Sequence, residues 1–122
     1  MPRVVHFEIH ADDVQRPVKF YGDLFGWKIK GWDGPVEYWL VNTGEDQEPG
    51  IDGAIMKRPD PAATGINYVD VPSVDEFAQK AVEGGGSLWM PKMAIPGMGY
   101  VAVCRDTEGN AFGLYQDDPS AA

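Results

Sequence analysis

The sequence has little cysteine, little positive charge and no long apolar run. Cys104 is the only cysteine among 122 residues, so no disulfide can form within the chain. Ten Lys and Arg against nineteen Asp and Glu give a formal net charge of -9, which repels phosphate backbones and anionic lipid. The N-terminal stretch MPRVVHFEIH has neither a signal-type apolar core nor a membrane span. We therefore predict no nucleic-acid partner, no membrane association and a cytoplasmic location.

What remains is the composition of a globular protein. Hydrophobic residues make up 43% of the chain and charged residues 24%, a balance that supports a packed core and argues against disorder. A chain of 122 residues has the size of one small domain. We therefore predict a single domain over residues 1–122.

The first half, residues 3–58, is predicted to form a strand, a helix and three further strands. Apolar and polar residues alternate along RVVHFEIHA, which is the period of a strand. Asp12 or Asp13 can cap a helix that runs to about Leu24, and Gly26 then ends it. Three short strands separated by polar turns follow at 27–32, 37–43 and 51–57.

After a connector at 59–64, residues 65–118 repeat this order. Ser73 and Glu76 form a capping box that predicts a helix, and the run Gly84 to Gly86 ends it. A Gly-Asn turn at 107–110 suits a tight hairpin between the last two strands. The predicted strands of this half are 65–71, 87–91, 100–106 and 111–116.

The two halves therefore look like an internal duplication, with offsets of 60 to 62 residues. The matched pairs are His6 with Asn67, Gly26 with Gly86, and Tyr38 with Tyr100. Two tandem βαβββ units predict an α+β fold in which a curled mixed sheet surrounds a concave, polar-lined pocket.

Several motifs carry a family resemblance that runs from Arg3 to about Gln116. FYGDLFGW, IPGMGY and DTEGNAFGLYQ, together with the duplicated βαβββ order, are similar to the vicinal oxygen chelate superfamily. That superfamily contains glyoxalases, bleomycin resistance proteins and extradiol dioxygenases, and this chain most resembles its small bacterial glyoxalase-like members. The resemblance implies frequent homodimers, and the edges of curled sheets give a second copy something to cover. We expect a homodimer.

In metal-using members, the resemblance implies ligands on the first and last strands of each unit. The corresponding residues here are His6, Asn67, Ala54 or a close neighbour, and Gly113 where relatives carry a glutamate. A divalent ion generally needs three or more protein donors, and one imidazole with one amide falls short of that. We therefore predict no cofactor and disfavour a divalent metal, for which His6 would be the ligand if one bound.

Three polar residues share one side of the first strand and leave several roles open. They step along the strand by about 6.6 Å per pair of residues, too far for all three to converge easily on one ion. His6 is a surviving ligand, a general base or a hydrogen-bonded strand histidine, and Glu8 is a base or a solvated carboxylate. His10, near the strand end, is predicted to be a surface residue.

Aromatic residues supply further pocket candidates. Tyr38, Trp39 and Tyr100 lie in corresponding predicted strands, whose side chains alternate between two faces, and at least one of these faces must line the pocket. We interpret Trp39 and Tyr100 as pocket candidates, with packing in the core as the alternative. The loop 93–99 is interpreted as either a lid or a plain connection. Cys104, which follows Val103 in a predicted strand, is predicted to be a core residue.

The leading hypothesis is a metal-free protein that binds a small, partly aromatic or apolar molecule. The predicted pocket residues are His6, Glu8, Trp39, Asn67, Tyr100 and Gly113. The alternative is a metal-dependent glyoxalase-type lyase, epimerase or dioxygenase that uses His6, with Glu8, Glu37 or Asp52 as the acids that would complete its site. A third possibility is a structural dimer module without a ligand. No catalytic residue is assigned beyond these.

Overall fold

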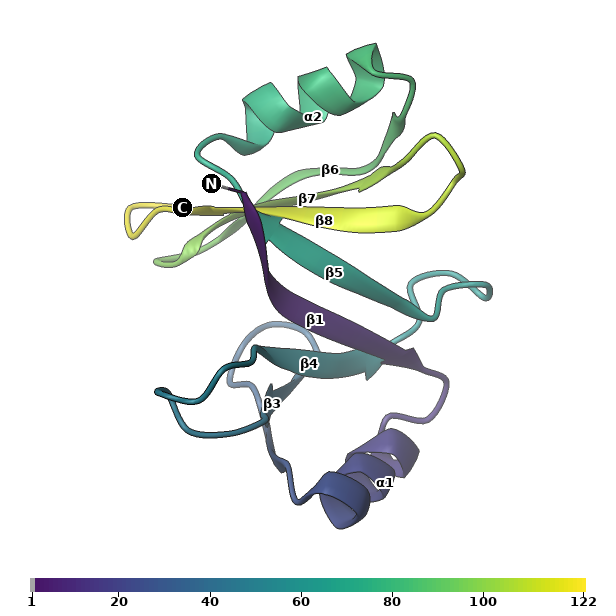
Figure 1. Ribbon diagram of the computed structural model, residues 1–122, viewed down its shortest axis with the longest axis vertical. Coiled ribbons are helices and arrows are strands. Elements are labelled where there is room, and N and C mark those ends of the chain that lie inside the picture. The colour runs from purple at the N-terminus through teal and green to yellow at the C-terminus, as the bar shows by residue number, and fades with distance from the viewer. Residues whose placement is uncertain (1) are drawn as a thin grey trace. The chain divides into compact units, whose positions relative to one another are not determined.

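A computed structural model describes residues 2–122 and divides them into two compact units. The N-terminal unit is His6–Gly65, and the C-terminal unit is Ile66–Ala122 with the described N-terminal residues through Val5. Each unit runs strand, helix and three strands (Figure 1). The predicted α+β class and duplicated βαβββ order are therefore confirmed. No helix within residues 2–122 is both long and apolar enough to span a bilayer.

The N-terminal unit has a four-stranded mixed sheet in the order β2-β3-β4-β1. Residues 6–11 of β1 pair in parallel with β4, while β2 with β3 and β3 with β4 pair in antiparallel fashion. Its elements are β1 (Arg3–Ala11), α1 (Gln15–Phe25), β2 (Lys28–Gly31), β3 (Trp39–Asn42) and β4 (Asp52–Lys57).

Helix α1 ends at Gly26, as the sequence indicates, but its N-cap is Val14, which provides no side-chain cap, and not Asp12 or Asp13. The Asp13 carboxylate accepts a hydrogen bond from the backbone N–H of Gln15 at 3.1 Å. At the other end, Gly26 adopts a left-handed φ of 71° and donates its N–H to the carbonyl of Gly22. A glycine fits this position because other residues enter the left-handed region at a steric cost.

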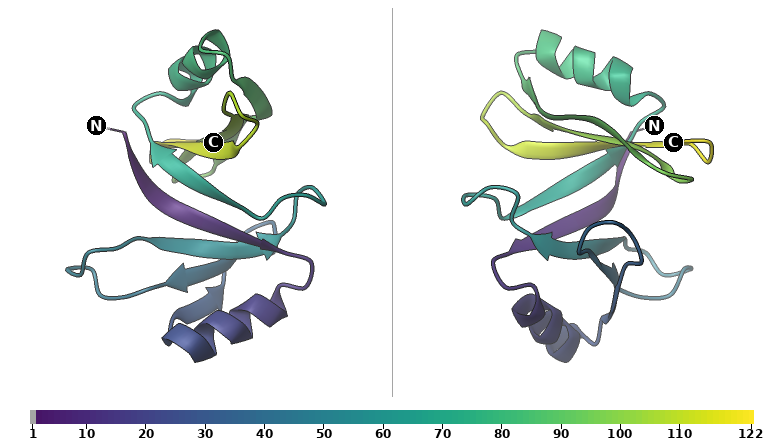
Figure 2. Two further views of the ribbon diagram at one scale, coloured as in Figure 1. Left: turned by 45° about the vertical axis from the view of Figure 1, so that its right-hand side comes forward. Right: turned by 180° about the vertical axis from the view of Figure 1, so that it is seen from behind.

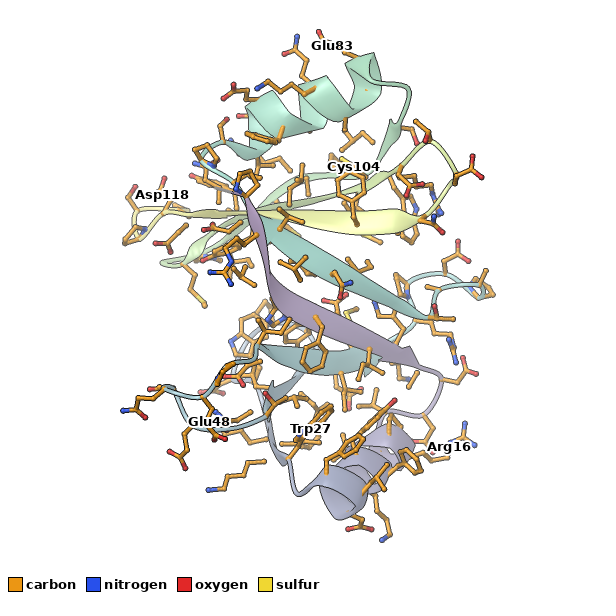
Figure 3. The ribbon with its side chains drawn as sticks, viewed as in Figure 1. Arg16, Trp27, Glu48, Glu83, Cys104 and Asp118 are labelled. Atoms are coloured by element: carbon orange, nitrogen blue, oxygen red, sulfur yellow. The ribbon has the colours of Figure 1, made fainter. Side chains whose placement is uncertain are left out.

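The core of this unit lies between α1 and one face of the sheet. Val14, Val41 and Ile55 are buried there. Partly buried side chains pack around these three, including Phe7, Ile9, Val18, Tyr21, Trp27, Ile29 and Trp39. Trp27, beside α1 in Figure 3, is in ring contact with Phe7 and Tyr21. The unit is thus stabilised mainly by aliphatic and aromatic contacts beneath the helix.

The C-terminal unit has the corresponding sheet order β5-β8-β7-β6. Here β5 pairs in parallel with β8, and β8 with β7 and β7 with β6 pair in antiparallel fashion. Its elements are β5 (Gly65–Asp70), α2 (Val74–Glu83), β6 (Ser87–Ile95), β7 (Gly99–Arg105) and β8 (Ala111–Asp117).

Helix α2 is tightly joined to its sheet. The Ser73 hydroxyl accepts the backbone N–H of Glu76 at 3.1 Å, as the predicted cap requires. Val74 in its first turn and Cys104 in β7 are both fully buried, and Figure 3 draws Cys104 between the helix and the strands. Burial raises the pKa of the Cys104 thiol. The prediction that this cysteine is a core residue is confirmed.

Residues 93–99 form a strand end and a turn. Met93 to Ile95 belong to β6, which is longer than the 87–91 predicted. Gly97, with a φ of 76°, allows the chain to reverse, and the N–H of Met98 donates to the carbonyl of Ile95. The segment is therefore the plain connection between β6 and β7, which lie side by side in both views of Figure 2.

Candidate functional site

Each sheet has one face against its own helix and one face without a helix, called here the helix-free face. In the N-terminal unit, Phe7 and Ile9 of β1 pack with the cluster beneath α1. Successive side chains of a strand point to opposite sides. His6, Glu8 and His10 therefore lie together on the helix-free face of this unit.

Glu8 is the centre of a hydrogen-bonded cluster on that face. The Tyr38 hydroxyl donates to Oε2 of Glu8 at 2.9 Å, and Nε2 of His10 lies 2.8 Å from Oε1. Because a carboxylate only accepts, His10 donates through Nε2. Glu8 is only 6% exposed and His10 only 4%. The prediction that His10 is a surface residue is wrong, because its imidazole turns inward to Glu8.

His6 extends the cluster at its more accessible end. Its Nε2 lies 2.9 Å from the Tyr38 hydroxyl oxygen, and the two rings stack with centroids 6.3 Å apart. Since the Tyr38 proton goes to Glu8, His6 is the donor in its bond with Tyr38. Burial lowers the pKa of His6 below its ordinary 6.5 and outweighs the opposing effect of the Glu8 and Asp52 carboxylates. His6 is therefore a neutral imidazole at pH 7, protonated on Nε2.

One atom of the cluster lacks a partner among the described residues. The Nδ1 atom of His10 is buried and makes no hydrogen bond within residues 2–122. An unsatisfied buried polar atom costs about 1–3 kcal/mol. The cluster thus carries a free energy cost at this buried atom.

Trp32 forms an aromatic wall beside the cluster. Its ring meets the Tyr38 ring edge-on, with centroids 5.9 Å apart. A Cβ at Gly34 would lie 2.1 Å from the Trp32 ring, so a glycine is needed where the indole lies over the turn. Trp32, Tyr38 and His6 are all partly exposed, so their rings offer flat surfaces beside a buried acid.

The helix-free face of the C-terminal unit carries different residues at the corresponding places. Tyr68 of β5 pairs with Gly113 of β8, as Glu8 pairs with Ala54 in the first unit. Val69 packs with the α2 cluster, so its neighbour Tyr68 lies on the helix-free face. A Cβ at Gly113 would lie 2.2 Å from the Tyr68 ring. The space beside Gly113 is therefore filled by this ring.

The alignment of His6 with Asn67 is one residue out of step. By strand pairing Glu8 corresponds to Tyr68, an offset of 60, so His6 corresponds to Ile66. Asn67 is exposed and alternates to the side of β5 that Val69 shares. A shift of one residue moves every side chain of a strand to its other face. The predicted Asn67 therefore does not lie on the face that corresponds to that of His6.

Trp39 and Tyr100, predicted as pocket residues, lie on the helix-covered faces of their sheets. Trp39 packs with the cluster beneath α1, and Tyr100 packs with the cluster beneath α2. Tyr38, which the prediction set aside in favour of Trp39, joins His6 and Glu8 instead. The sequence holds a signal for this choice, because the apolar Val41 shares the side of Trp39 and so marks that side as core.

The side chains at the implied ligand positions do not fit a divalent ion. Ala54 and Gly113 offer no side-chain donor, and His6 directs its Nε2 proton at Tyr38. Among residues 2–122, no three His, Cys, Asp or Glu side chains are grouped so that they could hold a metal. Protein sites for such ions generally use three or more donors. No step that involves a metal is therefore derived for this site.

The paired βαβββ units and the buried Glu8 cluster define a small α+β protein with a polar face on its first sheet. The family described as bleomycin resistance protein-like N-terminal matches residues 3–44. CFP32 of Mycobacterium bovis, a provisionally assigned glyoxylase, is 31% identical in an alignment of length 119 that covers 89% of this chain and 43% of the relative. The chain thus spans less than half the length of this curated relative.

Solved structures agree in fold. A glyoxalase/bleomycin resistance protein/dioxygenase superfamily member from Vibrio splendidus is 17% identical, covers 97% of this chain and 100% of its own, and superposes with a TM-score of 0.67. A Streptomyces coelicolor methylmalonyl-CoA epimerase variant, solved with 2-nitronate-propionyl-CoA, is 13% identical over 98% of this chain and 97% of its own, with a TM-score of 0.68. At these identities the likeness concerns the fold. The chain is thus similar to a bleomycin resistance protein-like family over residues 3–44, and to the glyoxalase/bleomycin resistance protein/dioxygenase superfamily in fold.

Proposed function

We propose that this protein binds a small molecule on the helix-free face of its N-terminal unit, without a protein-bound metal. The observation that carries the proposal is the chain of hydrogen bonds that runs from the partly exposed His6 and Tyr38 to the buried Glu8 and His10. Burying the Glu8 carboxylate between a tyrosine hydroxyl and an imidazole costs free energy that an apolar residue at the same place would not cost. Such local conflicts with stability are concentrated at functional sites.

The chemistry of this face favours a ligand with a planar or apolar part and a polar group. The rings of Trp32 and Tyr38 offer surfaces for stacking. Hydrogen-bonding groups of His6 and Glu8 lie beside them and suit the polar end. Methylmalonyl-CoA epimerase, similar in fold, was solved with a CoA ester derivative, which combines these two kinds of group.

The test is a ligand screen with a matched pair of tyrosine variants. Wild-type protein is examined as purified by native mass spectrometry, and by thermal shift against a panel of planar aromatic acids and acyl-CoA esters. Tyr38→Phe removes a hydroxyl of the cluster, whereas Tyr21→Phe removes the hydroxyl of an α1 residue that packs against the core of the unit. We expect at least one compound to stabilise the wild-type protein. Its affinity should fall at least about tenfold in Tyr38→Phe and stay unchanged in Tyr21→Phe. Equal effects in both variants would remove this site from the proposal.

The metal part of the proposal has its own measurement. Elemental analysis and calorimetric titration with Zn²⁺, Mn²⁺, Mg²⁺ and Fe²⁺ should give no tightly held stoichiometric ion, because Ala54 and Gly113 contribute no donor. A stoichiometric, tightly bound divalent ion would contradict it.

A second candidate function is an acid–base enzyme of lyase or epimerase type that uses His6. The hydrogen bonds favour it, because the Tyr38 hydroxyl links the His6 imidazole to the Glu8 carboxylate and so provides a path for a proton. His6→Ala should then abolish turnover, measured first with methylglyoxal and glutathione and then as solvent deuterium uptake at the α carbon of an acyl-CoA ester. Unchanged rates in the variant would eliminate this candidate.

The proposal also includes a cytoplasmic location and a homodimer. The location rests on the single, buried Cys104, which suits a reducing compartment. The homodimer rests on large apolar side chains that remain exposed, among them Phe20 and Leu24. Fractionation of cells and sedimentation of the purified protein test these two points separately.

A further inference from the structure

Helix α1 exposes a patch of large apolar side chains, called here the α1 patch: Phe20, Leu24 and Phe25. Their exposed fractions are 58%, 58% and 56%. Phe20 and Phe25 each contact the ring of Tyr21, so the patch is continuous with the aromatic cluster of the unit. In Figure 2 one side of α1 faces the strands of its unit and the other faces away from them.

Helix α1 is apolar on two sides, and only one of them is covered by its own sheet. Val18 and Tyr21 pack inward, yet no residue of α1 is fully buried. An ordinary surface helix is polar on its outer side. Helix α2 follows that rule, because apart from Val82 its exposed residues are charged or amide side chains. The outer apolar side of α1 therefore calls for a partner surface.

The size of the α1 patch fits the centre of a modest protein interface. Two phenylalanines that are a little over half exposed leave roughly 200 Å² of aromatic surface in water. With Leu24 the patch reaches the scale of the largest apolar patch on a typical monomer, about 300–600 Å². A standard interface buries about 800 Å² per partner, so surrounding polar residues must supply its rim.

The charges beside the α1 patch are self-complementary. Lys19 and Asp23 form an ion pair at 2.6 Å along one flank of the patch. In an antiparallel packing about a two-fold axis, the same flank of each helix faces its counterpart in the reverse direction. An axis that sets Phe20 opposite the second copy's Leu24 also brings each Lys19 within reach of the second copy's Asp23. Opposite charges thus meet on both sides of the axis.

Self-repulsion is also smaller here than elsewhere on this acidic chain. The whole chain carries a formal charge of -9, whereas α1 holds two basic residues, Arg16 and Lys19, against the single acid Asp23. Two copies that meet through α1 therefore bring together one of the less acidic parts of each.

We infer that the α1 patch is the surface through which two copies of this chain associate, with their α1 helices antiparallel. The inference rests on the homodimer in the proposed function and names its interface. It is independent of ligand binding, because the α1 patch and the Glu8 cluster use different residues.

Sedimentation velocity over a wide concentration range, with matched helix variants, tests the inference. Phe20→Glu and Leu24→Glu place a charge in the α1 patch and should weaken the dimer at least about tenfold. Val82→Glu is the control, since Val82 is an apolar residue of α2 that is 51% exposed. It should leave the dimer unchanged. Circular dichroism melts confirm that each variant is folded.

A charge exchange tests the antiparallel arrangement. Lys19→Glu and Asp23→Lys, each alone, should weaken the dimer roughly two- to fivefold, and the double variant should restore it. A wild-type protein that stays monomeric throughout, a dimer indifferent to Phe20→Glu and Leu24→Glu, or a patch that binds only a different protein would each overturn the inference. The ligand screen is repeated on the Phe20→Glu variant. Its result tests the binding site separately from the dimer interface.

Discussion

In the N-terminal unit the paired residues on the helix-free face are Glu8 and Ala54, and in the C-terminal unit they are Tyr68 and Gly113. Both pairs join a large side chain on the first strand to a small residue on the last strand. Glu8 is held by Tyr38 and His10 through hydrogen bonds, whereas Tyr68 lays its ring over the glycine. The same frame thus carries a polar cluster in one unit and aromatic packing in the other.

The helices differ in a corresponding way. Helix α2 has a side-chain cap from Ser73 and a fully buried Val74, whereas α1 has no buried residue and an exposed apolar patch. The two units of the duplication therefore differ in packing. The helix of the C-terminal unit is the more deeply packed, whereas the N-terminal unit carries the buried polar cluster and the exposed apolar patch. Binding and association should therefore depend on residues of the N-terminal unit, whereas substitutions in both units should affect stability.

The largest expected effect comes from the acid at the centre of the polar cluster. Glu8→Ala leaves two donors, the Tyr38 hydroxyl and the buried His10 imidazole, without their acceptor. At about 1–3 kcal/mol for each donor, it should lower the free energy of unfolding by the sum of the two losses. Denaturant unfolding measures this loss. A loss no larger than that of an exposed carboxylate, such as Glu83→Ala, would mean that the cluster is not a coupled unit.

The next largest effect tests the aromatic pair of the C-terminal unit. Gly113→Ala should destabilise by about 1–3 kcal/mol, because the new Cβ collides with the Tyr68 ring. In a Tyr68→Ala background, the same substitution should cost nearly nothing, since the obstacle is gone. A double-mutant cycle by chemical denaturation measures the coupling, and additive losses would show that the ring is not the reason for the glycine.

A smaller effect compares the two helix starts. Ser73→Ala should destabilise the protein by about 1 kcal/mol, because the Glu76 N–H loses its acceptor at the first turn of a well-packed helix. Asp13→Ala at the start of α1 is the matched variant, and it should cost less because α1 is less buried. Thermal melts of both variants give the order, and a reversed order would contradict the packing contrast.

The smallest effect is a pH dependence that arises from His6. Its pKa is lowered by burial in the folded state, so below its ordinary 6.5 the unfolded chain takes up a proton that the folded chain resists. The His6 contribution to stability is therefore present at neutral pH and is lost as pH falls from about 6.5 toward the depressed folded pKa. Unfolding free energies at neutral and mildly acidic pH should fall less in His6→Gln than in wild type. An equal fall in both would assign the dependence to other groups.

Much of the fold follows from local patterns. The alternation along β1, the Ser73 cap and the turn at Gly109 each specify a local conformation, and each occurs where the sequence indicates. Their physical origin lies within a few neighbouring residues, so one sequence suffices to predict them.

The candidate site was harder to predict, because side-chain faces depend on pairing between distant strands. The predicted internal repeat is one residue out of step at Asn67, so this residue was expected on the opposite face of its strand. The prediction also chose Trp39 over its neighbour Tyr38, because the face of that strand that meets the core had not been identified. His10 is buried together with its polar acceptor, Glu8, and composition alone does not reveal the burial of such a pair. Burial is a property of the whole packed structure and not of a short sequence window.

Cys104 offers a practical probe of the difference between the units. It is the sole thiol of the chain, it is fully shielded beneath α2, and its pKa is raised, so a labelling reagent must wait for the surrounding structure to open. The rate at which Cys104 is labelled in the wild-type protein therefore reports the opening of the C-terminal unit, without any engineered reporter. Under native conditions, substitutions confined to the Glu8 cluster should change the Cys104 labelling rate only when they promote opening of the C-terminal unit.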